Sequence, residues 1–539
     1  MKVYAAVARA LQDNGVDTLF GLLGDANMLY VTDFMKEGGR YIGGVDERGV
    51  VLMAHGYARI GNRIGVASIT HGPAVTNALT SLTEAARSRT AMLVITGDTP
   101  AIRDHIQHID LPSLVGPTGA LYQRVHNAAE VIDDVAIAIR RAIAARLPLV
   151  LDLPVDLLVA DVAEAQSRFG PVPTQAVMPD ENALDRALGV IASARRPVVI
   201  AGRGAVLGES RKELLQLADS IGAPLATTLL ARDYFRGEAF DLGVIGTVAH
   251  DVAVGILAES DCVIAFGAGL NRFTAAEGSA FVGKAVVQID TDAAVFGAYT
   301  PVDAAVLGDA RIAAKLMADQ LRAAGHQPAL FRSAQMAAAL AGYDPRNDFK
   351  DVSTETTLDV RAAMIRLDEL LPADRTVVTD VGRFVAAPWR YLHVKDPLGF
   401  AHAASFGSIG LGTAMGIGAA AVNPTTRWTL VIAGDGGAMM GIVEFTTAVR
   451  HRLPLVLVVV NDGSYGAEWN KLNAFGVDSE YALIAWPDFA EVGRALGGFG
   501  STVRTMADLE RVSDRIANSE FPLLVDLKVD PSVDIGLLA

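Results

Sequence analysis

Two aspartates that end successive apolar runs are the residues whose types and spacing suggest chemistry most directly. Asp435 lies in VIAGDGGAMM, and Asp462 lies in LVLVVVNDGSYG. Each apolar run is short and rich in β-branched residues, which predicts a buried strand, and a helix-like segment separates the two. Adjacent parallel strands place their carboxyl ends at one edge of a sheet, where ligands bind. We therefore expect the two carboxylates to face one ligand.

Glycines around the first aspartate suit a diphosphate that is held through a metal ion. Gly434, Gly436 and Gly437 would let backbone N–H groups approach a ligand at a helix N-terminus. Two carboxylates alone would repel a diphosphate, so a divalent cation is expected between them. Mg²⁺ fits, because it takes oxygen ligands from one or two carboxylates and from phosphates. A backbone carbonyl near Ser464 is the expected further ligand.

The length and composition of the chain limit the kinds of domain and partner that these residues can belong to. The chain has 539 residues, a formal net charge of −15 and 51% apolar residues, and roughly 150 residues per domain would give three or four domains. The acidic balance argues against a nucleic-acid partner. The single cysteine, Cys262, lies in an apolar run and is expected to be a core residue in a reducing compartment. No apolar run reaches transmembrane length and the start does not resemble a signal peptide, so a cytoplasmic location without a membrane partner is expected.

Apolar strands alternate with helical patterns along the whole chain. This rhythm predicts an α/β fold with open, mostly parallel sheets that are flanked by helices. Polar or proline-bearing stretches at roughly 161–181 and 326–355 interrupt the rhythm and are interpreted as linkers. They divide the chain into three predicted domains, at 1–165, 182–325 and 355–539.

One stretch of the predicted first domain parallels a stretch of the third. Residues 77–98 and 441–462 align without a gap, and both run from a helix through a basic turn to a strand with an acidic end. In that register His71 aligns with Asp435. One explanation is that the two domains share one fold. The other is that the similarity has no such meaning, because any two strand–helix units look alike.

The acidic pair and its glycines resemble the cofactor-binding motif of the thiamine diphosphate-dependent enzymes. That family includes acetolactate synthase, benzoylformate decarboxylase and pyruvate decarboxylase. Its motif begins with Gly-Asp-Gly and ends, just under thirty residues on, in Asn-Asn or Asn-Asp. This chain departs at the second metal-binding side chain, which is usually Asn and is Asp462 here. Aspartate in place of asparagine keeps an oxygen ligand and adds a negative charge. We therefore expect the site to bind a metal, and the difference leaves open which metal it prefers.

The resemblance spans the chain and implies a pyrimidine-binding, a central and a diphosphate-binding domain. The segment GVDERGVV implies that Glu47 contacts the aminopyrimidine ring, with Asp46 where the family has His or Asn. TDVGRF resembles the first diphosphate loop, and FGSIGLG the segment that holds the cofactor bent. The further cofactor-binding residues implied are Gly382, Arg383, Gly407, Ile409, Ser464, Tyr465 and Gly466.

The resemblance also implies chemistry and assembly. Thiamine diphosphate forms a carbanion at its thiazolium ring and then acts as an electron sink. Glu47 would share a proton with the pyrimidine ring and so help this deprotonation. In the family, the first domain of one subunit and the third of another form each site. A homodimer is therefore the expected minimum, and a homotetramer stays open.

Five further side chains are candidates for acid–base work. Asp25 in FGLLGDANM and Glu468 fall where pyruvate decarboxylases keep active-site acids. His105 and His108 lie near where those enzymes have a histidine pair, although their pair is adjacent in sequence and this one is spaced by three. His71 lies in a turn that faces the same region. The alternatives are a turn residue for Asp25, a solvated acid for Glu468, and ordinary surface or pocket-lining groups for the histidines.

The sequence leaves open which of two related reactions the protein catalyses. The central segment and the TDVG loop look more like acetolactate synthase, which favours decarboxylation of a 2-oxo acid followed by carboligation. The alternative is release of an aldehyde without ligation. FAD in the central domain, near 202–205 and 267–272, stays undecided. Other classes are a catalytically inactive regulatory homologue and a nicotinamide oxidoreductase, although the glycine spacing at 410–418 is wrong for the latter.

Overall fold

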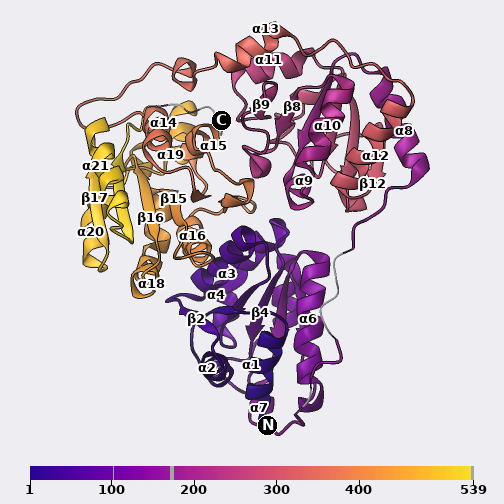
Figure 1. The fold of residues 1–539 in the computed structure, drawn as a ribbon. Coiled ribbons are helices and arrows are strands. Elements are labelled where there is room, and N and C mark those ends of the chain that lie inside the picture. Colours follow the sequence, from indigo (N-terminus) through magenta and orange to yellow (C-terminus); the bar gives the residue numbers. More distant parts are fainter. Residues whose placement is uncertain (101, 103, 165, 170–174, 534, 536–539) are drawn as a thin grey trace.

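The computed structural model describes residues 1–100, 102, 104–164, 166–169, 175–533 and 535. Figure 1 shows three bodies, with the first domain at the bottom, the central domain at the upper right and the third domain at the left. Each contains one six-stranded sheet in which every strand pair is parallel. The predicted α/β architecture of three parallel sheets is confirmed.

The first domain has the strand order β2-β1-β3-β4-β6-β5. Its strands are β1 Thr18–Gly21, β2 Arg40–Gly43, β3 Gly65–Ser68, β4 Met92–Thr96, β5 Leu121–Arg124 and β6 Pro148–Asp152. Its helices are α1 Val3–Asp13, α2 Met28–Lys36, α3 Glu47–Gly61, α4 Pro73–Arg87, α5 Leu111–Val115, α6 Val131–Ala145 and α7 Val155–Leu158. Helices of at least nine residues connect most parallel neighbours, as a crossover requires.

The third domain repeats this topology strand for strand, in the order β14-β13-β15-β16-β18-β17. Its strands are β13 Arg375–Thr379, β14 Phe400–His402, β15 Trp428–Gly434, β16 Leu455–Asn461, β17 Phe499–Val503 and β18 Leu523–Lys528. Its helices are α14 Val360–Leu370, α15 Ala386–Tyr391, α16 Gly412–Ala420, α17 Asp435–Gly441, α18 Phe445–Arg450, α19 Gly466–Ala474, α20 Phe489–Ala495 and α21 Met506–Ala517. The hypothesis that the first and third domains share one fold is confirmed.

The central domain has a different order, β12-β11-β10-β7-β8-β9, in which the first strand of the domain lies in the middle. Its strands are β7 Pro197–Ala201, β8 Leu225–Thr227, β9 Asp241–Val244, β10 Cys262–Phe266, β11 Ala285–Asp290 and β12 Ala304–Leu307. Its helices are α8 Glu181–Ser193, α9 Arg203–Leu207, α10 Arg211–Ile221, α11 Asp251–Glu259 and α12 Ala310–Ala323. Cys262 is buried in β10, as predicted.

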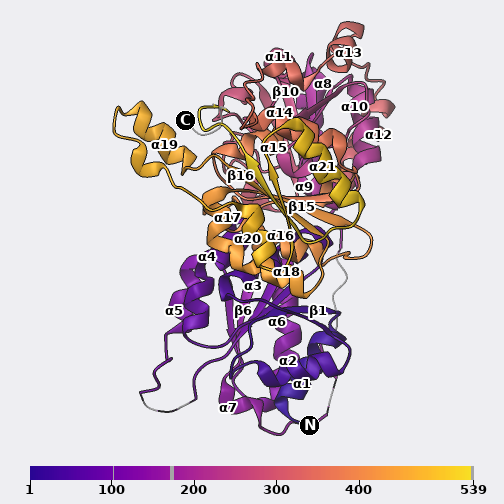
Figure 2. The ribbon, with the colours of Figure 1, turned by 90° about the vertical axis from the view of Figure 1, so that its left-hand side faces the viewer.

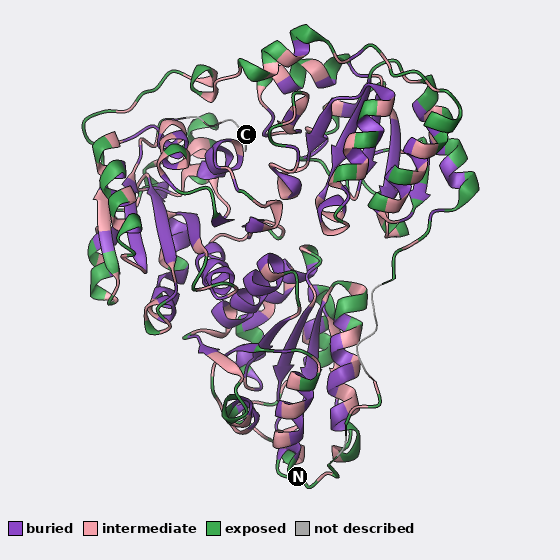
Figure 3. Cartoon of the chain, viewed as in Figure 1, coloured by how far each residue is buried: buried purple, intermediate pink, exposed green. Residues whose placement is uncertain are grey.

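Two helices join the first and third domains backbone to backbone. A Cβ added at Gly56 of α3 would lie 1.9 Å from the carbonyl oxygen of Met415 in α16. A Cβ at Gly418 would lie 1.8 Å from the carbonyl oxygen of Met53. Glycine is therefore required at both positions, and one buried apolar cluster runs through both domains. Figure 3 shows this continuous burial along α3 and α16.

The stretch 326–355 is more than a bare linker. It contains helix α13 Ala334–Ala341, and Met336 of that helix is buried in the apolar core of the central domain. Within the part of the chain that the structure describes, no helix combines the length and apolar character needed to cross a membrane.

Candidate functional site

The acidic pair lies at the carboxyl edge of the third sheet. Asp435 is the first residue of α17, directly after β15, and Asp462 directly follows β16. These strands are hydrogen-bonded neighbours in parallel register, with Gly434 opposite Val460. The local sequence explains the positions, because each β-branched run ends at a glycine or an Asn-Asp-Gly turn.

Asp435 is held by backbone donors in a buried position. It is 3% exposed, and its carboxylate accepts N–H groups from Gly436 at 2.6 Å and Gly463 at 2.8 Å. Burial, and secondarily the charge of Asp462, raises the pKa of Asp435 to about 7, against the opposing backbone hydrogen bonds. The carboxylate form is therefore costly at this edge unless a cation compensates it.

Asp462 has a different environment. Its Oδ1 accepts the backbone N–H of Ser464 at 3.0 Å and the Ser464 hydroxyl at 2.8 Å. Its Oδ2 accepts from Nη2 of Arg383 at 2.8 Å. The two carboxylates are thus unequal: one has a cationic partner on its own chain, and the other has only backbone donors.

The residues present fit a divalent cation beside a diphosphate. The acidic pair supplies two carboxylates, and among the described residues there is no group of three or more His, Cys, Asp and Glu side chains arranged to hold a metal. A cation here would therefore need further ligands from phosphate and water. Two carboxylates suit Mg²⁺, which keeps waters and takes phosphate oxygens for its remaining positions. A side chain is excluded at Gly436 of α17, because a Cβ there would lie 2.5 Å from the Tyr465 ring.

A third buried acid, Asp380, was missed in the sequence, although it sits inside the noted TDVGRF loop. It is fully buried, and Gly410 donates its N–H to Oδ2 at 2.8 Å. Burial raises the pKa of Asp380 to about 6, although four backbone N–H groups oppose this. A Cβ at Gly437 would lie 2.6 Å from the same oxygen. Asp380 therefore fixes the 409–412 loop against the start of α17. A polar residue directly after the strand RTVVT was the signal available.

The 407–410 loop carries two predicted cofactor contacts. The Ile409 Cβ would lie 3.5 Å from a Cβ at Gly437, so Ile409 borders the glycine-rich helix start. Gly407 is exposed and has φ +81°, a conformation that favours glycine. Gly382, on the neighbouring loop, has φ +154°. The structure gathers the third-domain candidates at one edge.

Glu47 begins α3 and lies beside the third domain of the same chain. Its Oε2 accepts from Nδ2 of Asn77 at 3.1 Å, and the carboxylate is partly exposed. The preceding Asp46 caps the helix by accepting the N–H groups of Arg48 and Gly49. The helix N-terminus favours a negative charge at this position.

Glu444, which the sequence did not single out, secures that helix start. It is 2% exposed, and its Oε1 accepts the N–H groups of Val45 at 3.2 Å and Asp46 at 3.0 Å. Burial raises its pKa. Arg48 in turn donates to the carbonyl of Met440 at 2.6 Å. The segment after α17 thus positions the residue that precedes Glu47.

The first-domain candidates form a second group, at the carboxyl edge of the first sheet. The rings of His71 and His105 are 5.9 Å apart in an edge-to-face arrangement. His108 lies beside Thr99, with Nδ1 3.3 Å from its hydroxyl. Asp25 is exposed in a turn whose flanking residues, Gly24 and Ala26, approach Thr70, the neighbour of His71. Asp25 and His71 therefore lie in adjoining turns.

Glu468 is exposed on α19. Figure 2 shows that α19 projects from the third domain, on the same side of the molecule as α17, α4 and α5.

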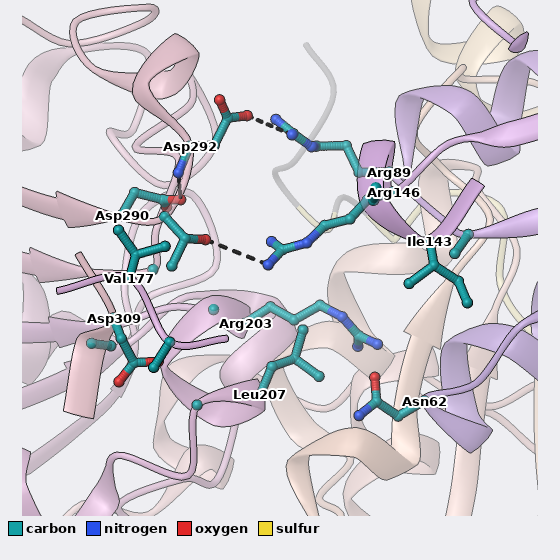
Figure 4. A pocket seen from close by; sticks show the side chains of 18 of the residues that line it. Asn62, Arg89, Ile143, Arg146, Val177, Arg203, Leu207, Asp290, Asp292 and Asp309 are labelled. Carbon is teal, nitrogen blue, oxygen red and sulfur yellow. Dashed lines mark hydrogen bonds and ion pairs between the residues drawn. The ribbon is translucent and has the colours of Figure 1, made fainter. Parts of the chain in front are cut away.

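A separate cavity lies between the first and central domains. Its volume is about 980 Å³, and it is lined by the ends of the central strands and by helix ends of the first domain. Figure 4 shows Arg89, Arg146 and Arg203 around it, with Arg89 paired to Asp292. Gly204 and Gly267 line it too, but a Cβ at Gly204 would lie 2.7 Å from Gly267, so close backbone packing already explains these glycines.

Three family models match successive parts of the chain. Residues 1–129 match "Thiamine pyrophosphate enzyme, N-terminal TPP binding domain", residues 184–317 match the central domain of that family, and residues 380–527 match its C-terminal TPP binding domain.

Named relatives align over almost the whole chain. A "Probable acetolactate synthase large subunit" from Methanococcus aeolicus is 25% identical, covering 99% of this chain and 93% of that protein. A "Sulfoacetaldehyde acetyltransferase" from Alcaligenes xylosoxydans xylosoxydans is 28% identical, covering 92% and 87%. An "Acetolactate synthase large subunit" from Parasynechococcus marenigrum is 28% identical, covering 97% and 87%.

Proposed function

The chain belongs to the thiamine pyrophosphate enzymes, and we propose that it uses thiamine diphosphate with Mg²⁺ to decarboxylate a 2-oxo acid. In the proposed reaction the decarboxylated donor is then joined to a second carbonyl compound. The observation that carries the proposal is the acidic pair Asp435 and Asp462, which follows two adjacent parallel strands, beside the glycines at the start of α17.

Each residue has a distinct task in this proposal. Asp435, Asp462 and the backbone near Ser464 would hold the metal, and the N–H groups at the start of α17 would meet the diphosphate. Ile409 would support the bent cofactor, with Tyr465 and Gly466 nearby. Thiamine diphosphate supplies a stabilised carbanion and an electron sink. Glu47 would exchange a proton with the aminopyrimidine ring.

Carboligation is favoured by the relatives that are named acetolactate synthase. The name of the other relative describes transfer of an acetyl group and does not specify a carbon–carbon bond. The second candidate is release of an aldehyde. His71, His105 and the adjoining Asp25 turn support it, because they supply proton donors at one edge.

Assembly completes the proposal. The first-domain edge with His71 and the third-domain edge with Asp435 would complete a site with the opposite edge of a second copy. A homodimer is the minimum assembly, and a homotetramer is the alternative.

The central test identifies products. Purified protein is incubated with thiamine diphosphate, Mg²⁺ and pyruvate, and products are identified by mass spectrometry. Acetolactate or another coupled product supports carboligation, and acetaldehyde alone supports the second candidate. If pyruvate is not consumed, a panel of bulkier 2-oxo acids follows. Protein that binds thiamine diphosphate with Mg²⁺ but turns over none of these acids would contradict the proposed substrate class.

FAD is a separate question for the cavity of Figure 4. Arg203 is half-buried; its Nη1 is withdrawn from solvent and has no hydrogen-bond partner, although Nη2 donates to the carbonyl of Arg59 at 2.9 Å. An unpartnered buried guanidinium nitrogen suits an anionic ligand, such as the diphosphate of FAD. A flavin absorbance near 450 nm in purified protein would support FAD, and a colourless protein would give no support for it.

A further inference from the structure

Arg383 and Asp462 form an ion pair inside the candidate site. Nη2 of Arg383 donates to Oδ2 of Asp462 at 2.8 Å. Both side chains are largely withdrawn from solvent, with exposed fractions of 10% and 14%. A pair this buried is stronger than an exposed one, and it is costly to break from either side.

The backbone around the pair is shaped to permit it. A Cβ at Gly466 would lie 2.7 Å from Nε of Arg383 and 3.0 Å from Oδ2 of Asp462. Any larger residue would press against both partners. Gly466 starts α19, so the absence of a side chain at this helix start leaves room for the guanidinium.

Arg383 also binds two other segments. Its Nη1 donates to the carbonyl of Pro531, near the end of the described chain, and to Oδ1 of Asn470 in α19 at 3.3 Å. Its guanidinium carbon lies 6.0 Å from the centre of the Trp469 ring. One side chain therefore connects the acidic edge, the projecting helix and the C-terminal segment.

We propose that Arg383 is the built-in counter-cation of Asp462, a positioning residue that leaves Asp435 as the one uncompensated carboxylate. The inference rests on the proposed function, since it assigns the cation environment of the same site. With Arg383 in place, the two carboxylates and the guanidinium carry a net charge of −1, the same as an Asp with a neutral Asn. The pair thereby allows Asp at the position where the resembling family usually has Asn.

The same arrangement couples the cation site to the projecting helix. Asp462 keeps Oδ1 on Ser464 while Oδ2 is engaged by Arg383. Movement of α19 or of the Pro531 segment would shift Arg383 and thus change the charge that a bound cation meets.

The test uses the full chain, Mn²⁺ alone as the probe, and the variants Arg383→Gln, Asp462→Asn and their combination. Mn²⁺ binding is followed by electron paramagnetic resonance without thiamine diphosphate. Removing a unit positive charge beside the cation should tighten binding by at least about tenfold in Arg383→Gln. Asp462→Asn should weaken it by a similar factor. The double variant restores the net charge and should return to within about threefold of the unmodified chain.

Two controls separate charge from contact. Arg383→Lys keeps the charge but loses the planar fork, so Mn²⁺ affinity should stay within about threefold while the order of α19 changes. Arg494→Gln removes an arginine that forms an exposed pair with Glu491 in the same domain. That variant should leave Mn²⁺ binding unchanged within about twofold, because an exposed charge outside the site is screened by water and salt.

Urea unfolding provides a readout that needs no ligand. It is measured for the unmodified chain, Arg383→Gln, Asp462→Asn and the double variant. The destabilisation of the double variant should be smaller than the sum of the two single variants, because the first change already removes the pair. Additive losses would overturn the pairing. Equal Mn²⁺ affinity in Arg383→Gln and Arg494→Gln, or no detectable binding in Arg383→Gln, would overturn the counter-cation role. Failure of the proposed function would appear separately, as an unmodified chain that binds no thiamine diphosphate.

Discussion

The first and third sheets have the same strand order, yet their carboxyl edges are chemically different. His71 stands where Asp435 stands, and Asp98 stands where Asp462 stands, in the gap-free register of the two domains. Asp98 pairs with Arg124 at 2.5 Å, much as Asp462 pairs with Arg383 at 2.8 Å. What differs is the other position, which is an acid in the third domain and a histidine in the first.

This difference alters the electrostatics of the two edges. Burial raises the pKa of Asp98, but hydrogen bonds from Arg124 and the Thr99 backbone, with nearby positive charge, outweigh it and hold the pKa below its ordinary value. Burial raises the pKa of Asp435 to about 7, and the neighbouring Asp462 adds to the rise. One fold therefore gives a compensated edge in the first domain and an edge that needs a cation in the third.

The largest expected effect comes from removing the uncompensated acid. Asp435→Ala should weaken Mg²⁺-dependent binding of thiamine diphosphate by about 100-fold or more, because a metal ligand is lost outright. Calorimetry at fixed Mg²⁺ measures it. The matched variant His71→Ala, at the equivalent place on the first edge, should change this affinity by less than about threefold. Undiminished affinity in Asp435→Ala would show that the edge does not hold the metal.

The next effect concerns Glu47 at the start of α3. Glu47→Gln should slow proton exchange at C2 of bound thiamine diphosphate by about 100-fold or more, because the amide cannot take up or return a proton. Exchange into deuterium, read by NMR after quenching, measures the rate.

The control for that experiment is Glu130→Gln. Glu130 is an exposed first-domain acid that binds Asn127, as Glu47 binds Asn77. Equal exchange rates in the two variants would remove the acid–base role from Glu47.

The joint between the two domains should be sensitive to a single methyl group. Gly56→Ala should destabilise the chain by roughly 3 kcal/mol, because its Cβ would overlap the Met415 carbonyl and helix backbones cannot give way cheaply. Gly189→Ala is the matched control, since Gly189 is helical and has open space around it. That change should stabilise by up to about 1 kcal/mol. Urea unfolding compares the two, and equal effects would disprove the close contact of α3 and α16.

The smallest expected effect is on the pH dependence of folding stability, which should have opposite signs for Asp435 and for Asp98. The folded pKa of Asp435 is raised to about 7 from 3.8, so its contribution to stability is present at low pH and is lost as pH rises towards 7. Without ligands, the stability of Asp435→Asn relative to the unmodified chain should therefore grow as the pH rises from about 4 to 7.

Asp98 should behave in the opposite way. Its folded pKa is lowered, so its contribution is present above the unfolded value and is lost as pH falls through and below about 4. Asp98→Asn should be destabilised near neutral pH and should match the unmodified chain only in acid. Parallel pH profiles for Asp98→Asn and Asp435→Asn would contradict the difference between the two edges.

Most of the fold could be predicted from local sequence patterns. The parallel α/β architecture followed from short apolar runs alternating with helical segments, and the shared fold of the first and third domains followed from one aligned stretch. The same patterns placed Asp435 and Asp462 at strand ends, since strand termination is set by nearby turn residues. They did not indicate α13, because its short alanine-rich pattern lies between polar stretches.

The sequence by itself determined which residue types stand at the ends of which strands, because strands, turns and helix starts depend on neighbours in the chain. Only the tertiary structure decided their partners. Asp380 is bound by Gly410, thirty residues away, and Arg383 pairs with Asp462 across 79 residues. Glu444 supports the start of α3 from another domain. Whether a carboxylate needs a cation depends on burial and on such distant partners, and folding alone brings them together.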